Sequence, residues 1–147
     1  MQLVVGGDHA GFALKGPVVA ALRAWGHPVN DVGTHSPEPV DFPDIARVLC
    51  AEIQAGRAER GIMVCGTGVG AAIAANKLSG IRAAVCHDVY SAHQCVEHDN
   101  VNVLCLGAQI IGELLALDLV RTYLAADFSS SPEFRRRVAK LAELERN

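Results

Sequence analysis

Apolar residues along this chain follow two alternating spacings. Five short runs are rich in Val, Ile and Leu and are bounded by glycine, proline or asparagine, which is typical of strands. They cover residues 2–6, 27–33, 61–65, 81–86 and 101–107. The longer segments between them carry apolar residues three and four positions apart, as one face of a helix does. These predicted helices cover residues 12–25, 42–56, 69–78, 88–97 and 112–126.

The regular alternation of strand and helix predicts an α/β fold. Strand–helix–strand units connect through right-handed crossovers, which place their strands in parallel. Helices then cover the sheet on both faces. The length of 147 residues fits a single domain, so we expect one domain over residues 1–147.

A further helix is expected at the end of the chain. The segment SSSP, residues 129–132, is typical of a turn and helix cap, and residues 133–146 follow it with Val138, Leu141 and Leu144 as an apolar stripe. Because the sheet is already complete before this helix begins, the stripe needs another surface to pack against. We expect a partner subunit to provide it.

Composition and charge narrow the range of partners. The chain is 50% hydrophobic and has a formal net charge of -3, which disfavours nucleic-acid and anionic-membrane surfaces despite the basic cluster Arg135 to Arg137. The segment MQLVVGGDHAG has no signal-peptide features, and no apolar stretch has the length of a membrane span, so we expect a cytoplasmic protein. The five cysteines have no paired spacing and are expected to be free thiols.

Polar residues with chemical potential gather where the predicted strands end. In an open parallel sheet, ligands bind beyond the carboxyl ends of the strands. The residues at these ends are Asp8, His9, Gly33, Thr34, Cys65, Thr67, His87 and Asp88. His98, Asp99 and Asn100 come just before the fifth strand instead, so their place at the same edge depends on how that loop folds.

The segment GIMVCGTGVGAAIAANK, residues 61–77, is open to three interpretations. GTGVGA fits a G-x-G-x-x-A dinucleotide fingerprint followed by Asp88, although it stands at the third strand rather than the first. Alternatively, its backbone N–H groups cradle developing negative charge, and Cys65 beside a helix start exists as a thiolate that accepts a proton or attacks an electrophile. In the third interpretation Cys65 is only a small buried hydrophobic residue.

The remaining cysteines and histidines carry weaker signals. Cys50 lies in a helical run and Cys105 in an apolar strand, so core packing is the expected role of both. Three His–Asp neighbours, at residues 8–9, 87–88 and 98–99, raise a metal site as an alternative. None of them has the spacing of a helical ligand pair, and we expect no metal.

Several segments together resemble one enzyme family. They are GGDHAGFALK, DVGTHSPEPVDFPD, MVCGTGVGAAIAANK, GIRAAVCHDVYSAHQCVEHDNVNVLCLGAQIIG and the arginine-bearing tail. In this order and over nearly the full chain, they resemble the ribose-5-phosphate isomerase B family, which includes the galactose-6-phosphate isomerase subunits. The resemblance implies a Rossmann-like three-layer α/β/α sandwich with a five-stranded parallel sheet. It also implies homodimers, or dimers of dimers, with active sites between subunits that interconvert aldose and ketose phosphates without metal or organic cofactor.

The same resemblance assigns roles to individual residues. Cys65 matches the base that moves a proton between C1 and C2 of the open-chain sugar, and His98 matches the histidine that opens the sugar ring. Thr67 matches part of the loop that stabilises the enediolate, together with the backbone of Gly66, Gly68, Val69 and Gly70. Such a mechanism requires a base, an oxyanion site and a proton shuttle. The other residues of the predicted substrate site are Asp8, His9, Asp99, Asn100, Gln109, Glu133 and Arg137.

The chain departs from the family pattern at three places. The family's GAR is GAQ here, which gives Gln109, its tail Arg-His is Glu133-Phe134, and the tyrosine of its DYP is Phe42. The resemblance implies that arginines at these places hold the substrate phosphate, partly across the dimer. Arg137 still matches a tail arginine. Because two expected positive charges are missing, we expect ribose 5-phosphate to bind weakly.

Other functions remain open on the sequence alone. The substrate is a sugar phosphate held by Arg135 to Arg137, a differently phosphorylated sugar, or an unphosphorylated one. Alternatively, the chain is a nucleotide-binding module, or a non-catalytic subunit of a hetero-oligomer. The leading hypothesis is a cofactor-independent sugar isomerase that acts through an enediol.

Overall fold

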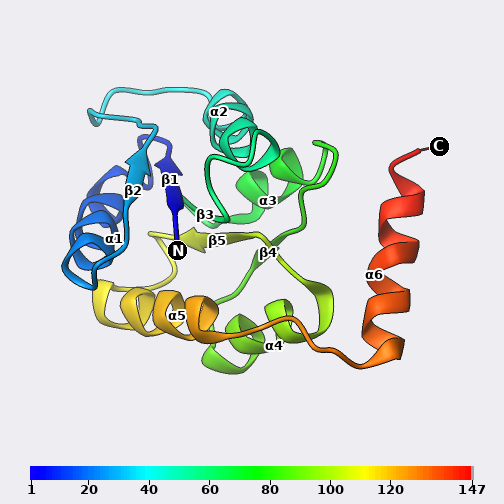
Figure 1. Ribbon diagram of the computed structural model, residues 1–147. Helices are drawn as coiled ribbons and strands as arrows, with labels where there is room; N and C mark the ends of the chain where they lie inside the picture. Colours follow the sequence, from blue (N-terminus) through cyan, green and yellow to red (C-terminus); the bar gives the residue numbers. More distant parts are fainter. Residues whose placement is uncertain (147) are drawn as a thin grey trace.

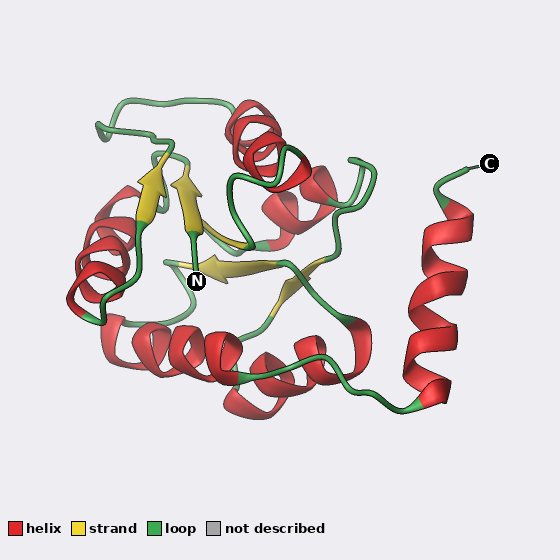
Figure 2. Cartoon of the chain, viewed as in Figure 1, coloured by secondary structure: helices red, strands yellow, loops and turns green. Residues whose placement is uncertain are grey.

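The computed structural model describes residues 1–146 and contains a parallel sheet of five strands (Figures 1 and 2). The strands are β1 (Leu3–Gly7), β2 (Val29–Asp31), β3 (Arg60–Cys65), β4 (Ala83–Val85) and β5 (Val103–Gly107). Their order across the sheet is β2-β1-β3-β5-β4, and every neighbouring pair is parallel. The predicted α/β fold with a five-stranded parallel sheet is confirmed.

Helices cover both faces of this sheet. The helices α1 (Phe12–Ala24), α4 (Val89–Asp99) and α5 (Glu113–Ala125) pack on one face, and α2 (Phe42–Gln54) and α3 (Val69–Ala75) pack on the other. Because side chains alternate along a strand, Leu3 and Val5 of β1 join the first core, whereas Val4 between them joins the second. The layers are those of the predicted three-layer sandwich.

The two edge strands are shorter than their apolar runs predicted. β2 covers three residues of the predicted strand 27–33, and β4 covers three residues of the predicted strand 81–86. Each edge strand pairs on one side only, so fewer ladder hydrogen bonds hold its ends in an extended conformation. At the open side of β4, the Asn76 amide bonds both the N–H and the C=O of Ala83, at 2.8 Å each, in place of a further strand.

A sixth helix, α6 (Pro132–Leu144), lies outside the sandwich (Figure 1). None of its residues is buried. Near its start, the ring of Phe134 stacks on His98 of α4 with a centroid distance of 3.9 Å. Just beyond its end, the Glu145 carboxylate accepts hydrogen bonds from the Ser79 hydroxyl and the Gly80 N–H, each at 2.9 Å. The helix is therefore fastened to the body at its two ends.

The apolar stripe of α6 is exposed between these two attachments. Leu141 is 45% exposed and Leu144 is 66% exposed. This surface is the one that the sequence predicted to pack on a partner subunit, and that remains a prediction. None of the helices within residues 1–146 has the length and apolar character needed to cross a membrane.

Candidate active site

The loops that follow β1 and β3 meet at the centre of the sheet. From β1 the chain continues to the edge strand β2. From β3 it continues in the other direction along the sheet, to the edge strand β4. Loops that diverge in this way leave a crevice at the carboxyl ends of their strands. Asp8 and His9 follow β1, Cys65 ends β3, and the loop after β5 brings Gln109 to the same edge. We call this edge, at the carboxyl ends of the strands, the Cys65 edge.

Cys65 is held beneath the glycine-rich loop that follows it. Its side chain is 5% exposed, and the Gly68 N–H donates a hydrogen bond to Sγ at 3.0 Å. The sulfur therefore lies within hydrogen-bond distance of a backbone donor of the glycine-rich loop. Gly68 has φ of +82°, a left-handed conformation that a side chain would strain. The glycine therefore permits the turn that points this N–H at the sulfur.

Cys50 and Cys105 belong to the same core cluster as Cys65 but are more deeply buried. Both are fully buried in the core between the sheet and the α2–α3 layer. Burial raises the pKa of Cys50 to about 11, and it raises the pKa of Cys105 as well. Both thiols therefore stay protonated near neutral pH and fill the core, as their positions in the sequence predicted.

Close backbone contacts shape the loop after Cys65. A Cβ added at Gly107 would lie 2.7 Å from Cα of Thr67, so only glycine lets β5 approach the loop so closely. The exposed Thr67 hydroxyl accepts a hydrogen bond from the Val69 N–H at 3.3 Å. The Gln109 side chain lies over Gly66, where an added Cβ would be 3.0 Å from its Oε1. A neutral amide thus lies directly beside the predicted oxyanion loop.

Asp8 and His9 are fixed by short-range and long-range contacts respectively. Asp8 is 7% exposed, and its Oδ1 accepts a hydrogen bond from the Gly11 N–H at 3.0 Å. The exposed His9 ring accepts a hydrogen bond from the Val40 N–H at Nδ1, at 3.2 Å. In the neutral His9 ring the proton is therefore on Nε2. Both side chains belong to the Cys65 edge, as predicted from the strand ends.

His87 supports this edge in a way that the sequence did not reveal. Its Nε2 accepts a hydrogen bond from the Gly107 N–H at 2.9 Å. β4 pairs with β5 only as far as Val85 and Cys105, so the imidazole supplies the acceptor that the neighbouring strand no longer offers. Burial lowers the pKa of His87 below its ordinary value of 6.5, against the opposing effect of Asp88. The ring is therefore held in its neutral form.

This contact predicts a loss of stability in acid. The native pKa of His87 is lower than that of the unfolded chain, so the unfolded state binds more protons around and below pH 6.5. The stabilising contribution is complete above that pH and is lost as the pH falls. We expect Tm, measured between about pH 5 and 8, to fall less steeply in acid for His87→Gln, whose amide oxygen accepts without titrating. Identical pH dependence of the two proteins would contradict this role of His87.

His98 lies at the opposite end of the sheet, beside the amino-terminal ends of the strands. α4 runs back from the Cys65 edge, Asn100 ends it with a left-handed φ of 51°, and β5 starts at Val103. The Cα partner of Cys65 is Gly107, at the far end of β5 and roughly 13 Å along the strand from its start. The loop before β5 does not fold back to that end. One chain therefore does not bring His98 or Asn100 to Cys65.

The tail residues of the predicted site lie on α6, at the same end of the sheet as His98. Glu133 and Phe134 belong to the first turn of α6, and the guanidinium carbon of Arg137 lies 5.5 Å from the centroid of the Phe134 ring. Asp99 and Arg137 both line a hollow against α6. We call this edge, formed by the end of α4 and by α6, the His98 edge.

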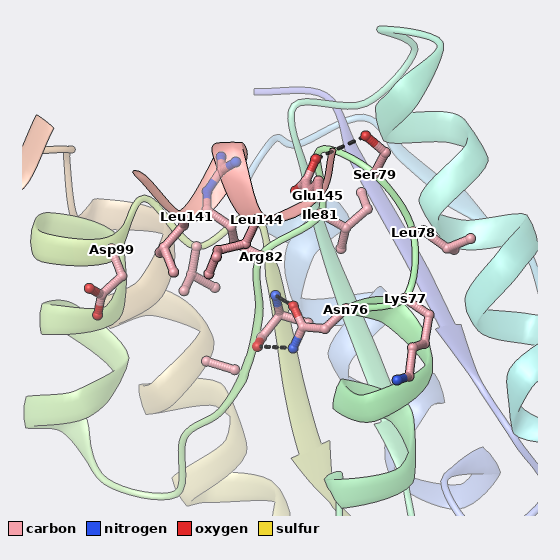
Figure 3. Close-up of a pocket in the computed structure, with 13 residues that line it drawn as sticks. Asn76, Lys77, Leu78, Ser79, Ile81, Arg82, Asp99, Leu141, Leu144 and Glu145 are labelled. Carbon is pink, nitrogen blue, oxygen red and sulfur yellow. Dashed lines mark hydrogen bonds between the residues drawn. The ribbon is translucent and has the colours of Figure 1, made fainter. Parts of the chain in front are cut away.

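A cavity of about 730 Å³ also opens at the His98 edge (Figure 3). Leu141 and Leu144 of α6 line it on one side, and Asp99 and Arg82 line it from the body of the protein. Figure 3 shows Glu145 reaching across to Ser79 above it. The cavity adjoins the start of β4, whereas Cys65 stands at the end of β3, so this cavity is not part of the Cys65 edge.

Two alternatives that the sequence left open, a dinucleotide site and a metal site, receive no support from the structure. Asp88, the acidic residue of the dinucleotide fingerprint, is the N-cap of α4 and accepts hydrogen bonds from the N–H and the hydroxyl of Ser91. The His–Asp neighbours at 8–9 and 98–99 lie at opposite edges of the sheet. Within residues 1–146, no three His, Cys, Asp or Glu side chains gather closely enough to hold a metal ion.

The chain is similar over almost its full length to known proteins. A family model described as Ribose/Galactose Isomerase matches residues 3–141. Ribose-5-phosphate isomerase B of Escherichia coli K12 is 40% identical over 98% of this chain and 96% of its own length. The 4-deoxy-4-sulfo-D-erythrose isomerase of Clostridium sp. MSTE9 is 39% identical over 90% of this chain and 84% of its own length.

A solved structure agrees with these relatives. Ribose-5-phosphate isomerase B of Clostridium thermocellum superposes with a TM-score of 0.97 at 43% sequence identity, covering 99% of this chain and 98% of that one. Coverage is nearly complete on both sides, so the similarity concerns the whole chain rather than a shared nucleotide-binding half. Both the motifs and the fold lead to one assignment. The chain belongs to the ribose/galactose isomerase family, and the predicted enzyme class, a sugar isomerase, is confirmed.

Proposed function

We propose that this enzyme interconverts the aldose and ketose forms of a short sugar through an enediol, with Cys65 as the base. The observation that carries the proposal is the hydrogen bond from the Gly68 N–H to Sγ of Cys65, at the carboxyl end of the central strand. A buried thiolate and a row of backbone donors then share one edge. The enzyme needs no organic cofactor for this reaction, because the thiolate itself carries the proton.

Each step uses a group at the Cys65 edge. The thiolate takes the proton from C2 of the aldose, and the electron pair moves to the carbonyl oxygen at C1. The N–H groups of the loop and the Thr67 hydroxyl stabilise the resulting enediolate. The proton of the C2 hydroxyl moves to the oxygen at C1. The proton on sulfur, or one exchanged with water, is then returned to C1 as the C2 carbonyl forms, which gives the ketose. Asp8 and His9 bind hydroxyl groups of the open-chain sugar.

A cyclic sugar must open before this chemistry, and we assign that step to His98. Because His98 and Cys65 lie at opposite edges of one chain, a site that contains both requires two copies. The proposed homodimer sets the His98 edge of one copy against the Cys65 edge of the other. Exposed apolar side chains at both edges support this contact, with Leu144 on α6 and Leu114, 83% exposed, at the start of α5.

A shared site predicts that two inactive variants restore each other. Cys65→Ala and His98→Ala are each expected to turn over a cyclic sugar phosphate poorly. After denaturation and refolding as a 1:1 mixture, half of the dimers are mixed, and each mixed dimer has one intact site. We expect about a quarter of wild-type activity from the mixture, whereas each variant refolded alone stays inactive. Mixed dimers that form without recovered activity, or a fully active monomer in sedimentation at micromolar concentration, would contradict the shared site.

The proposed substrate carries its anionic group at the end of the sugar remote from the carbonyl. The relatives are named for a pentose phosphate and for a tetrose sulfonate, and both of these sugars fit that description. In this chain the side chain beside the oxyanion loop is the neutral Gln109, and the first turn of α6 carries the negative Glu133. Arg135 to Arg137 are the cations closest in sequence to that turn. We propose that ribose 5-phosphate is a poor substrate. A sugar whose anionic group needs fewer positively charged partners is preferred.

A further inference from the structure

The His98 ring is held by two residues to which the mechanism above gives no role. Gln94, one helical turn earlier on α4, places its amide nitrogen 2.8 Å from Nδ1 of His98. Phe134 of α6 stacks on the face of the imidazole, with centroids 3.9 Å apart and an angle of 13° between the ring planes. The ring is thus held at one nitrogen and on one face, by two helices that are far apart in the sequence.

The contact with Gln94 determines where the His98 proton resides. An amide nitrogen donates hydrogen bonds and does not accept them, so Nδ1 is the acceptor and the neutral ring carries its proton on Nε2. The nearest carboxylate, that of Glu97, lies 3.8 Å from Nε2, which is beyond hydrogen-bond distance. The same Glu97 oxygen lies 3.0 Å from Nε2 of His93 instead. The Nε2–H of His98 therefore remains available to another acceptor.

We propose that Gln94 and Phe134 are positioning residues that present His98 as an Nε2–H donor to the ring oxygen of a cyclic substrate. This inference rests on the proposed function, in which His98 of one copy opens the sugar ring at the Cys65 edge of the other. In that step the bond between C1 and the ring oxygen breaks, and its electron pair goes to the ring oxygen, which takes the proton from Nε2. The anomeric hydroxyl loses its proton to water as the C1 carbonyl forms, and water returns a proton to His98.

The two contacts have complementary effects. The hydrogen bond to Nδ1 fixes which nitrogen carries the proton, but by itself it leaves the ring free to tilt about that bond. Stacking against Phe134 fixes the plane of the imidazole and removes water from one face. With both contacts present, the direction of the Nε2–H bond is determined before substrate arrives, which lowers the entropic cost of the proton transfer.

The positioning role predicts a dependence on substrate that a general structural role would not produce. Ribose 5-phosphate closes through its 4-hydroxyl and is mainly a furanose in water. D-erythrose 4-phosphate has its 4-oxygen esterified, so it cannot form that ring. Only the pentose phosphate requires ring opening, and only its turnover should depend on His98 and on the residues that orient it.

The experiment compares kcat/KM for these two substrates in a set of variants, at about pH 9, where an imidazole is neutral. Gln94→Glu keeps the size of the side chain, but its carboxylate accepts from Nδ1–H and so moves the proton away from Nε2. We expect Gln94→Glu and Phe134→Leu to lower kcat/KM for ribose 5-phosphate at least tenfold and to leave that for erythrose 4-phosphate within twofold. Phe134→Tyr, which keeps the stack, and the neighbouring His93→Gln should preserve the wild-type ratio.

A spectroscopic arm of the experiment does not depend on turnover. In protein with ¹⁵N-labelled histidine, with His98 assigned by comparison with His98→Ala, the wild type should show the proton on Nε2 at pH 9. Gln94→Glu should show it on Nδ1. A proton that stays on Nε2 in Gln94→Glu would overturn the role of Gln94.

The kinetic outcomes also separate this inference from the function on which it rests. If His98→Ala lowers pentose turnover selectively while Gln94→Glu and Phe134→Leu leave the substrate ratio unchanged, the positioning role is wrong and the proposed function stands. If His98→Ala itself leaves the ratio unchanged, His98 opens no ring, and its assignment in the proposed function is wrong as well. Equal losses on both substrates in Gln94→Glu and Phe134→Leu would indicate a purely structural role and would also overturn the inference.

Discussion

Replacement of Cys65 by alanine is expected to lower kcat by about three orders of magnitude, because general-base catalysis by a positioned group contributes up to that scale. The methyl group cannot take a proton, and the Gly68 N–H loses its sulfur acceptor. Cys65→Ser is expected to be nearly as inactive. A serine hydroxyl can still accept the Gly68 hydrogen bond, but it is far too weakly acidic to be present as the anion near neutral pH.

Cys50→Ala provides the matched control. Cys50 is a buried free cysteine like Cys65, and its burial raises its pKa to about 11, so it carries no thiolate near neutral pH. Its replacement should cost about 1 kcal/mol of stability through lost packing and leave kcat within a factor of two or three. Near-normal turnover by Cys65→Ala, with unchanged circular dichroism and Tm, would show that the base is another residue.

The fate of the substrate hydrogen provides an independent check on the enediol. A thiolate that has taken up the C2 proton can exchange it with water before returning it to C1. An aldose deuterated at C2 should therefore lose part of its deuterium to solvent during turnover by the wild type, as measured by mass spectrometry of the ketose. Complete transfer of the deuterium to C1 would instead indicate a hydride shift.

The central strands could be predicted from the sequence because they are buried on both faces. β3 and β5 read as continuous apolar runs, and their predicted ranges differ from the observed ones by one or two residues. The edge strands were predicted too long, because an apolar run does not reveal that its strand has a neighbour on one side only. The ends of β2 and β4 depend on the order of the strands in space, which no local pattern contains.

In the candidate site, too, some positions could be predicted from the sequence and others could not. Cys65, Asp8 and His9 could be placed together because strand ends in a parallel sheet share one edge, whereas Gln109 was assigned to the site only through the family resemblance. The position of His98 could not be derived, since it depends on the left-handed Asn100 and on the pairing that starts β5. The contact between His87 and Gly107 joins residues twenty positions apart, and nothing local predicts it.

The two contacts to His98 differ in what the sequence contains. Gln94 precedes His98 by four positions on one helix, a spacing that places the two side chains on the same face, so this contact could have been found. The stack with Phe134 could not be found, because it depends on where α6 settles after a linker without regular structure.

The substrate prediction follows from charge at the two edges. Gln109 lies beside the oxyanion loop and Glu133 lies in the exposed first turn of α6, so in the proposed dimer they approach one site from two subunits. Hydrogen bonds between charged groups contribute about 1.5 to 3 kcal/mol each. Without two such bonds, transition-state binding of a phosphorylated sugar is weaker by roughly 3 to 6 kcal/mol, a factor of about one hundred to ten thousand.

Gln109→Arg combined with Glu133→Arg is therefore expected to raise kcat/KM for ribose 5-phosphate by at least a factor of about one hundred, with a smaller gain from each single change. Phe134 is retained in the double variant and in the single variants, because its ring stacks on His98. Turnover of an unphosphorylated tetrose or pentose should not rise, since a neutral sugar has no dianion to bind. Asp118→Arg, which makes the same change in net charge as Glu133→Arg alone but on the exposed side of α5, should leave both substrates unaffected. Efficient wild-type turnover of ribose 5-phosphate that the double replacement leaves unchanged would mean that Arg135 to Arg137 already anchor the phosphate, and that Gln109 and Glu133 do not determine the substrate.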